Sequence, residues 1–540
     1  MRRSLVVAAG VAATAAACAP RIDPTRPVIA MPVTRAEASG YTQTSTYGDV
    51  TTFLNTLRAR NAPVAIGSIG TTTEGRAIPY IIASRPLVTT PEEARRLGRP
   101  IVYVNANIHA GEVEGKEALL ALVRDLVYQR RANVLDSLVL IAVPDYNADG
   151  NEAFAPESVN RTEQNGPERV GQRPNAQGLD LNRDYMKAEA PETRGALAMF
   201  TAWDPDVYVD LHTTDGSYHG FALTYAPSLA PPAYAPGFAG DFTRDTLLPE
   251  IRARMSRRGI PVFDYGNFDS VYEERDITDT VKHGWYSYEH KPRYGTNYYG
   301  LRGRVSILSE AYSHDPFRKR VASTYAFVQE ILSATARHAA GLAAIRASAD
   351  SVRDPEVAIR SRLTTHPFDA PIPFEILVHT GDSSQTQPGV PRGVRRTGRF
   401  KTQVMPVYDR FEPTLSVQRP TAYLLPAGFP AVIDILRRNG IALTPATAGT
   451  AQRAQLFVVD SVTHAARPFQ KHDETRIVGH WRDTTITAPA GAMIVRADGR
   501  LGALAAYFLE PESDDGFVDW NFFDPALTVG RPYPVARLVR

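Results

Sequence analysis

Apolar and polar residues follow two different periods in turn along residues 41–345. Apolar residues at helical spacing predict helices, and short uninterrupted apolar runs, typical of strands buried on both faces, predict strands. The predicted helices are 49–60, 114–131, 192–203, 242–258 and 316–344. The predicted strands are 64–69, 78–84, 101–108, 138–143, 207–211 and 305–308, and the first two form a hairpin. This alternation predicts an α/β domain with a mostly parallel or mixed central sheet and helices on both faces.

The pattern changes after residue 345. Residues 346–370 are charged and contain proline, which predicts a linker, and residues 371–540 predict a smaller β-rich domain of unknown role. Its predicted strands are 374–378, 421–425, 456–459 and 492–496, and its predicted helices are 430–438 and 501–509. The acidic turn 510–516 predicts a solvated loop, with a Ca²⁺ site as the less favoured alternative.

The N-terminus has the layout of a secretory signal peptide. Arg2 and Arg3 precede an apolar run, 5–17, that is short for a membrane span, and Cys18 follows it. Because Cys18 is the only cysteine and stands at the expected cleavage site, residues 1–18 resemble a bacterial lipoprotein signal. That resemblance implies export to the periplasm or cell envelope, membrane attachment through a lipidated Cys18, and a polar linker over 19–40. Ordinary cleavage beside an incidental cysteine is the alternative.

Composition and charge exclude several classes of protein. Of 540 residues, 43% are hydrophobic and 22% charged, which is typical of a globular chain and not of a disordered or multi-span membrane chain. The formal net charge is only +2, so no basic surface favours a nucleic-acid partner. A soluble enzyme-sized protein remains.

Chemically active side chains gather at the ends of three predicted strands. His109 and Glu112 follow one strand, His212 ends another, and Glu310 ends a third. The carboxyl ends of the strands in an open α/β sheet share one edge, where ligand sites collect. Two imidazoles and one carboxylate are a common catalytic Zn²⁺ shell with a position open for water, and a further carboxylate suits a general base. The sequence therefore predicts a hydrolytic site with one zinc ion per chain.

Other sources of hydrolytic chemistry are excluded or disfavoured. The chain has no Gly-x-Ser-x-Gly elbow, and its single thiol lies in the leader, so no serine or cysteine nucleophile is indicated. Three protein ligands already fill a catalytic zinc shell, so the remaining histidines before and after Glu310 are not expected to be ligands. These are His219, His283, His290 and His314.

Between the zinc candidates lies the motif Asp180-Leu181-Asn182-Arg183. Together with the HxxE pair, the later histidine and the late glutamate, it resembles the zinc carboxypeptidase family, the carboxypeptidase A-like metallopeptidases, over roughly residues 45–340. The resemblance implies that His109, Glu112 and His212 bind zinc and that Glu310 is catalytic. It also implies that Asn182 and Arg183 hold the terminal carboxylate of a peptide, while Asp180 supports His109.

Two further roles follow from the same resemblance. Arg161, upstream of the motif, is predicted to stabilise the oxyanion together with zinc. The family's substrate-contacting tyrosine has several candidates before Glu310, and Tyr288 is the predicted one. The candidates are Tyr286, Tyr288, Tyr294, Tyr298 and Tyr299. Glu112 and His212 stand closer together than in the digestive members, which predicts trimmed loops.

These features predict a zinc metallopeptidase that removes C-terminal residues from a peptide substrate. An amidase acting on cell-wall peptides or N-acyl amino acids is the enzymatic alternative, because the same zinc site cleaves any amide positioned against it. A non-catalytic envelope-binding lipoprotein is the alternative of another class, and the complete set of site residues argues against it. Lys291 and Arg293 suggest an acidic substrate residue.

Overall fold

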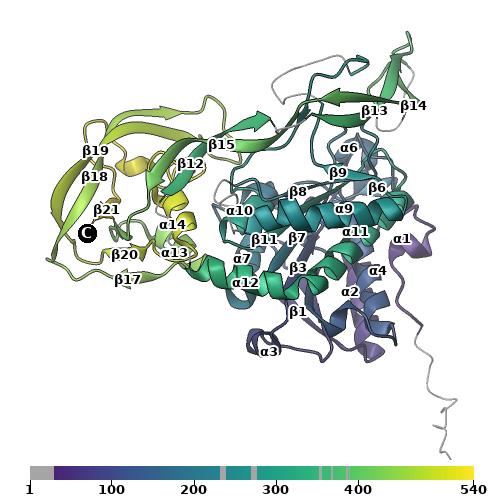
Figure 1. Ribbon diagram of the computed structural model, residues 1–540, viewed down its shortest axis with the longest axis horizontal. Coiled ribbons are helices and arrows are strands. Elements are labelled where there is room, and N and C mark those ends of the chain that lie inside the picture. The colour runs from purple at the N-terminus through teal and green to yellow at the C-terminus, as the bar shows by residue number, and fades with distance from the viewer. Residues whose placement is uncertain are drawn as a thin grey trace, which may run out of the picture. The chain divides into compact units, whose positions relative to one another are not determined.

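A mixed eight-stranded sheet lies at the centre of the first two thirds of the chain (Figure 1). The structure is a computed structural model that describes residues 30–230, 239–268, 277–351, 356–365, 369–384, 387 and 390–539. Along the sheet the strands are β1 (Val64–Thr71), β2 (Ala77–Ala83), β4 (Val139–Val143), β3 (Ile101–Ala106), β7 (Val207–Thr213), β11 (Val305–Ala311), β8 (Leu223–Pro227) and β9 (Val262–Asp264). Strands β4, β3, β7 and β11 are parallel to one another, whereas β2 and β8 run antiparallel to β4 and β11. The predicted mixed sheet is confirmed.

Helices cover both faces of this sheet (Figure 1). Val102 and Val104 of β3 pack in one core with α2 (Tyr47–Ala59), α4 (Glu114–Tyr128), α9 (Leu248–Arg257) and α11 (Phe317–Arg337). Tyr103, between them, packs in a second core with α7 (Pro191–Trp203) and α10 (Gly295–Leu301). Successive side chains of a strand point to opposite faces, so an uninterrupted apolar run serves both cores.

Several predicted bounds differ from the observed ones. The predicted helix 316–344 is two helices, because α11 ends at Arg337 and α12 (Ala339–Ser351) begins after His338. The predicted helix 242–258 is α8 (Ala239–Phe242), a π-helical turn (Thr243–Leu247) and α9. Strands β7 and β11 run further than predicted, so His212 and Glu310 lie inside strands. Polar residues end the apolar run there, although the strand pairing continues to Thr213 and Ala311.

Short elements complete this part of the chain. They are the helices α1 (Arg35–Ala38), α3 (Pro91–Leu97), α5 (Ala148–Glu152) and α6 (Glu157–Asn160), and the strands β5 (Ala155–Pro156) and β6 (Arg169–Val170). Two 3-10 turns, Val134–Asp136 and Leu181–Arg183, have three residues each. The predicted signal peptide and Cys18 lie outside the described residues. Within the described ranges, no helix combines the length and the apolar character that crossing a bilayer requires.

The C-terminal part is β-rich, as predicted. Strand β10 (Trp285–Tyr286) joins β15 (Val407–Gln418) and β12 (Glu356–Thr365) in one sheet, and β13 (Ala370–His379) pairs with β14 (Val394–Met405). A six-stranded sheet has the order β17 (Leu443–Pro445), β20 (Met493–Arg496), β16 (Ala422–Leu425), β21 (Ala536–Leu538), β18 (Ala451–His464) and β19 (Thr475–Thr487). Helices α13 (Pro430–Arg438) and α14 (Gly502–Leu509) pack against it.

The division of the chain is less sharp than the pattern change suggests. Strand β12 occupies much of the segment predicted as a linker, 346–370. One core cluster contains Tyr103 and Phe200 from the first part together with Phe457 and Trp520 from the last. Contacts group Pro32–Arg540 into one compact unit, and the predicted domain boundaries stay predictions.

The acidic turn 510–516 is not solvated, so that prediction is wrong. Glu510 is buried and accepts a hydrogen bond of 2.8 Å from Nε of Arg537. Asp515 is fully buried and accepts one of 2.7 Å from Nε of Arg293, in the first part of the chain. Buried carboxylates require such partners, because desolvating an unpaired charge costs several kcal/mol. The turn therefore ties two distant segments together.

Candidate active site

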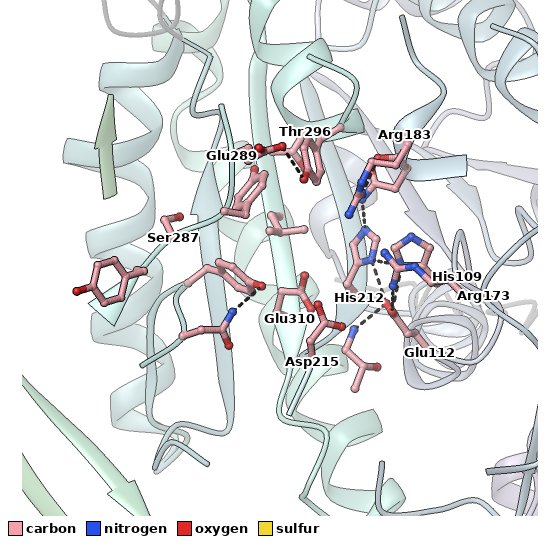
Figure 2. A pocket seen from close by; sticks show the side chains of 18 residues that line it. His109, Glu112, Arg173, Arg183, His212, Asp215, Ser287, Glu289, Thr296 and Glu310 are labelled. Carbon is pink, nitrogen blue, oxygen red and sulfur yellow. Dashed lines mark hydrogen bonds and ion pairs between the residues drawn. The ribbon is translucent and has the colours of Figure 1, made fainter. Parts of the chain in front are cut away.

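Three metal-binding side chains meet where β3 and β7 end. His109 and Glu112 lie in the turn between β3 and α4, and His212 lies in β7. Nδ1 of His109 is 3.0 Å from the Glu112 carboxylate and 3.2 Å from Nδ1 of His212, which is 3.0 Å from the other Glu112 oxygen. Figure 2 shows the three side chains facing one another on one side of the pocket. The positions are those that the sequence predicts.

This donor set fits zinc. Nitrogen and oxygen ligands about 2.0–2.2 Å from Zn²⁺ in a tetrahedral shell lie roughly 3.3 Å from one another, close to the observed separations. The other ring nitrogen of His109 lies 3.0 Å from Asp180, and that of His212 lies 3.2 Å from Asp210. Carboxylates behind ligating histidines are typical of protein zinc sites, because they orient the ring and raise its basicity.

Two local features let the turn adopt this shape. Asn107 has a φ of 64°, which reverses the chain directly after β3. A Cβ on Gly111 would lie 2.6 Å from Cγ of Arg161 and 3.0 Å from the carbonyl oxygen of Gly171, so only glycine fits against these neighbours. The sequence His-Ala-Gly-Glu therefore places both ligands at the sheet edge while Arg161 packs behind them.

Glu310 lies beside the ligand cluster. Strand β11 runs parallel to β7, and the register pairs Glu310 directly with His212. Its carboxylate lines the same pocket as Asp215 and has no hydrogen-bond or ion-pair partner among the described residues (Figure 2). Desolvation raises the pKa of Glu310 well above its ordinary value; the charge of His212 opposes this rise and that of Glu112 adds to it. A carboxylate held unpaired beside a cationic site is suited to accept and return a proton.

Charges nearby keep the other two site carboxylates ionised. Burial alone would raise the pKa of Glu112, but the charges of His109 and Arg161 outweigh it and hold that pKa well below its ordinary value. Burial acts in the same way on Asp180, and the charges of His109 and Arg173 hold its pKa low. Ionised oxygens are the form in which a carboxylate binds a metal or orients an imidazole.

The motif around Asp180 forms a short 3-10 turn over Leu181–Arg183, which Asp180 caps by accepting a hydrogen bond of 2.9 Å from the Asn182 amide. The Asn182 side chain accepts a bond of 2.8 Å from the Gly295 amide, and the Arg183 guanidinium lies 4.1 Å from the centre of the Tyr294 ring. Both side chains line the pocket, and their role in holding a terminal carboxylate stays a prediction.

Aromatic residues also line this pocket, a cavity of about 240 Å³. Tyr288 lines it, and its hydroxyl donates a hydrogen bond of 3.2 Å to Asn297. Tyr286 and Tyr294 line it too, whereas Tyr298 and Tyr299 are buried in the core. Four of the lining residues are tyrosines, and the fourth, Tyr265, was not a sequence candidate.

Arg161 and Arg173 occupy different places. Arg161 is buried behind the ligands, where its guanidinium donates to Glu112 at 3.0 Å and to two backbone carbonyl oxygens, and it is not among the residues that line the pocket. Arg173 does line the pocket and donates to Asp180 at 2.9 Å. Sequence reasoning missed Arg173 and Asp210. The available signals were a basic residue in the loop before Asp180 and an acidic residue two positions before His212, on the same strand face.

Arg293 is not available to a substrate. Its side chain is 3% exposed and pairs with Asp515, Asp519 and Glu474 at 2.7–2.9 Å. The suggestion that Arg293 recognises an acidic substrate residue is therefore wrong, and Lys291 is not among the residues that line this pocket. Among the described residues, the only cluster arranged as metal ligands is that of His109, Glu112 and His212, so the four histidines excluded from the shell are not part of one.

The C-terminal part also supports the loop that carries Asp180. The Gln470 side chain accepts a hydrogen bond of 2.8 Å from the Asp180 amide, and Lys471 donates to the carbonyl oxygen of Gln177. Nε2 of His472 lies 3.0 Å from the Glu189 carboxylate. Residues nearly 300 positions apart therefore hold one side of the pocket, which no local pattern predicts.

The chain is similar to several known proteins. Residues 50–232 match the zinc carboxypeptidase family. The chain is 22% identical to carboxypeptidase 2 of Trichophyton rubrum over 503 residues, which are 90% of this chain and 85% of that protein. It is 32% identical to human carboxypeptidase Z over 163 residues, 28% of this chain and 23% of that protein. A metallo-carboxypeptidase structure from Pseudomonas aeruginosa superposes with a TM-score of 0.38 and 19% identity over 55% of this chain and 70% of that one.

The matched range contains the ligand residues His109, Glu112 and His212 and the motif Asp180–Arg183, so the part of the chain that is similar to the zinc carboxypeptidase family is the part that forms the candidate site.

Proposed function

We propose that the protein is a zinc-dependent carboxypeptidase that removes C-terminal residues from peptides. One observation carries the proposal: a zinc-type ligand cluster, an unpaired glutamate and the Asn182–Arg183 pair line a single pocket. The matched family and the relatives named carboxypeptidase support it. The first two features are those of a hydrolase, and the third restricts the cut to the end of a chain.

Zinc held by His109, Glu112 and His212 would polarise the scissile carbonyl and lower the pKa of water. Glu310 takes the proton of the attacking water and delivers it to the leaving amine as the C–N bond breaks. Asn182 and Arg183 bind the terminal carboxylate, since a guanidinium and an amide provide several donors in a fixed arrangement. Tyr288 lines the same pocket and would contact the substrate there.

The oxyanion role passes in this proposal from Arg161 to Arg173. Arg161 donates its hydrogen bonds to Glu112 and the backbone behind the ligands, whereas Arg173 lies in the pocket wall. We expect Arg173→Gln to lower kcat/KM by about 10²-fold, with zinc content unchanged, because it removes one donor to the developing negative charge. Arg161→Gln should instead lower the melting temperature, because it leaves buried acceptors unpaired. If Arg161→Gln lowered kcat and left the melting temperature unchanged, the oxyanion role would return to Arg161.

The reaction itself is tested by product analysis. Peptides with a free C-terminus should lose their last residue, and the same peptides with a C-terminal amide should be resistant, because they lack the carboxylate that Arg183 binds. Muropeptides serve as the competing substrates. Release of internal fragments, or faster cleavage of muropeptides than of any linear peptide, would replace carboxypeptidase by endopeptidase or cell-wall amidase.

We further propose that residues 1–18 direct export and that Cys18 is lipidated, which would anchor the enzyme in the cell envelope. The support is the sequence alone, with one cysteine directly after an apolar leader. Replacement by Cys18→Ser should move the protein from the membrane to the soluble fraction after export. Unchanged membrane association would contradict the proposal.

A further inference from the structure

A second cavity, of about 420 Å³, adjoins the first one at the segment that carries Tyr286 and Tyr288. Residues 286–289 line both this cavity and the first one, in which Ser287 and Glu289 are seen in Figure 2. Its remaining walls come from β12, β15, β19 and the turn that follows α14. The cavity is therefore built jointly by the segment that carries Tyr288 and by the C-terminal part. Its volume is within the range of ligand pockets.

Two of the three Lys and Arg side chains in this cavity lack carboxylate partners among the described residues. Arg360 donates through Nε to the carbonyl oxygen of Glu512 at 2.6 Å and has no carboxylate within ion-pair distance among the described residues. Arg476 is exposed, and no side-chain partner is found for it in the described part of the chain. The third, Lys291, is 4.0 Å from Glu289.

Of the two acidic residues in the lining, Glu289 lies beside Lys291, and Asp514 already has partners. Asp514 lies 3.1 Å from Nε2 of His290 and accepts a hydrogen bond of 2.6 Å from the Tyr507 hydroxyl, so it does not neutralise the arginines. Phe411 and Ile477 are among the apolar residues of the lining. Cationic groups above apolar and aromatic walls favour a peptide segment with carboxylate side chains.

We propose that this cavity is a second substrate subsite, which binds acidic side chains of the peptide upstream of the residue that is released. The inference rests on the proposed function, since it places the terminal residue in the first cavity. A peptide that leaves the first cavity past Tyr288 and Glu289 meets the second directly, because the same residues form the wall of both. Guanidinium groups without carboxylate partners gain charge-assisted hydrogen bonds when a carboxylate enters.

The test uses alanine-based acetylated hexapeptides with a free C-terminus. Glu or Gln is placed in turn at positions 2–5, which are the four residues before the one that is released. We expect Glu to exceed Gln in kcat/KM by about five- to tenfold at one or two positions. Arg476→Gln and Arg360→Gln should each bring this Glu/Gln ratio towards one. The ratio is unaffected by any loss of folded or metal-loaded enzyme, because both peptides meet the same preparation.

Arg482→Gln is the matched control, since Arg482 lies on the same exposed strand, β19, but does not line the cavity. It should retain the wild-type ratio. If the wild type cleaves the Glu and Gln peptides equally at every position, the subsite proposal is overturned while the carboxypeptidase proposal stands.

A binding measurement separates the two proposals further. Amidated hexapeptides cannot offer a terminal carboxylate to Arg183, so their affinity by calorimetry reports on the second cavity without turnover. The best Glu peptide should bind the wild type about fivefold more tightly than its Gln counterpart, and Arg476→Gln should remove the difference. Equal affinities would overturn the subsite proposal. Failure to hydrolyse any peptide would reject the proposed function instead, and the affinities would still decide on the subsite.

Discussion

Glu310→Gln is expected to lower turnover by roughly 10²-fold or more while zinc content and folding persist. The substitution keeps the size of the side chain beside His212 and removes only the oxygen that can accept and return a proton. Because Glu310 has no hydrogen-bond or ion-pair partner among the described residues, its loss breaks no structural bond there. Steady-state kinetics, zinc analysis and thermal unfolding of the same preparation give the three readouts.

Asp215→Asn is the matched control for this prediction. Asp215 lines the same pocket next to Glu310, and its side chain is 64% exposed, so the change removes a neighbouring charge without removing the proposed base. It should keep most of the turnover. Near-wild-type turnover in Glu310→Gln would assign proton transfer to another group, even with zinc bound as predicted.

His212→Ala is expected to remove the metal itself. A three-ligand site that loses one imidazole binds zinc far more weakly, so the reconstituted variant should hold less than about half an equivalent, and activity should disappear with it. Asp210→Asn provides the comparison, because Asp210 lies behind His212 at 3.2 Å and is not a ligand. It should weaken zinc affinity by about 10–100-fold and leave the stoichiometry near one at saturating metal. A full equivalent of zinc in His212→Ala would show that the ligand set is wrong.

The ligands and Glu310 could be predicted because each follows a buried apolar run. Parallel strands bring their carboxyl ends to one sheet edge, so His109, His212 and Glu310 had to lie near one another once three strands were recognised. The exact strand ends were not predictable, since the apolar pattern stops before the hydrogen bonding does. Residues that contact the ligands without being ligands themselves, such as Asp210 behind His212, belong to no motif and are recognised only in the structure.

Partners from distant segments were beyond the reach of sequence patterns. The turn 510–516 reads as a solvated acidic loop because its charges have no local counter-ions. In the fold Arg293, more than 200 residues earlier, provides the counter-charge for Asp515. Arg161 and Arg173 show the same difficulty on a smaller scale, since both precede the Asp180 motif and only the packing tells which one faces the pocket.

The bonds from residues 470–519 to the pocket loops also bear on the moment at which the enzyme becomes active during its synthesis. A chain that has grown as far as α12 already contains the zinc ligands and the whole central sheet, which N-terminal regions form first. The Asp180 amide then still lacks Gln470, and Arg293 lacks its three carboxylates. Because residues 470–519 provide these partners, the nascent protein holds its metal ligands before its pocket is complete, and we expect hydrolysis only after residue 519 has been synthesised.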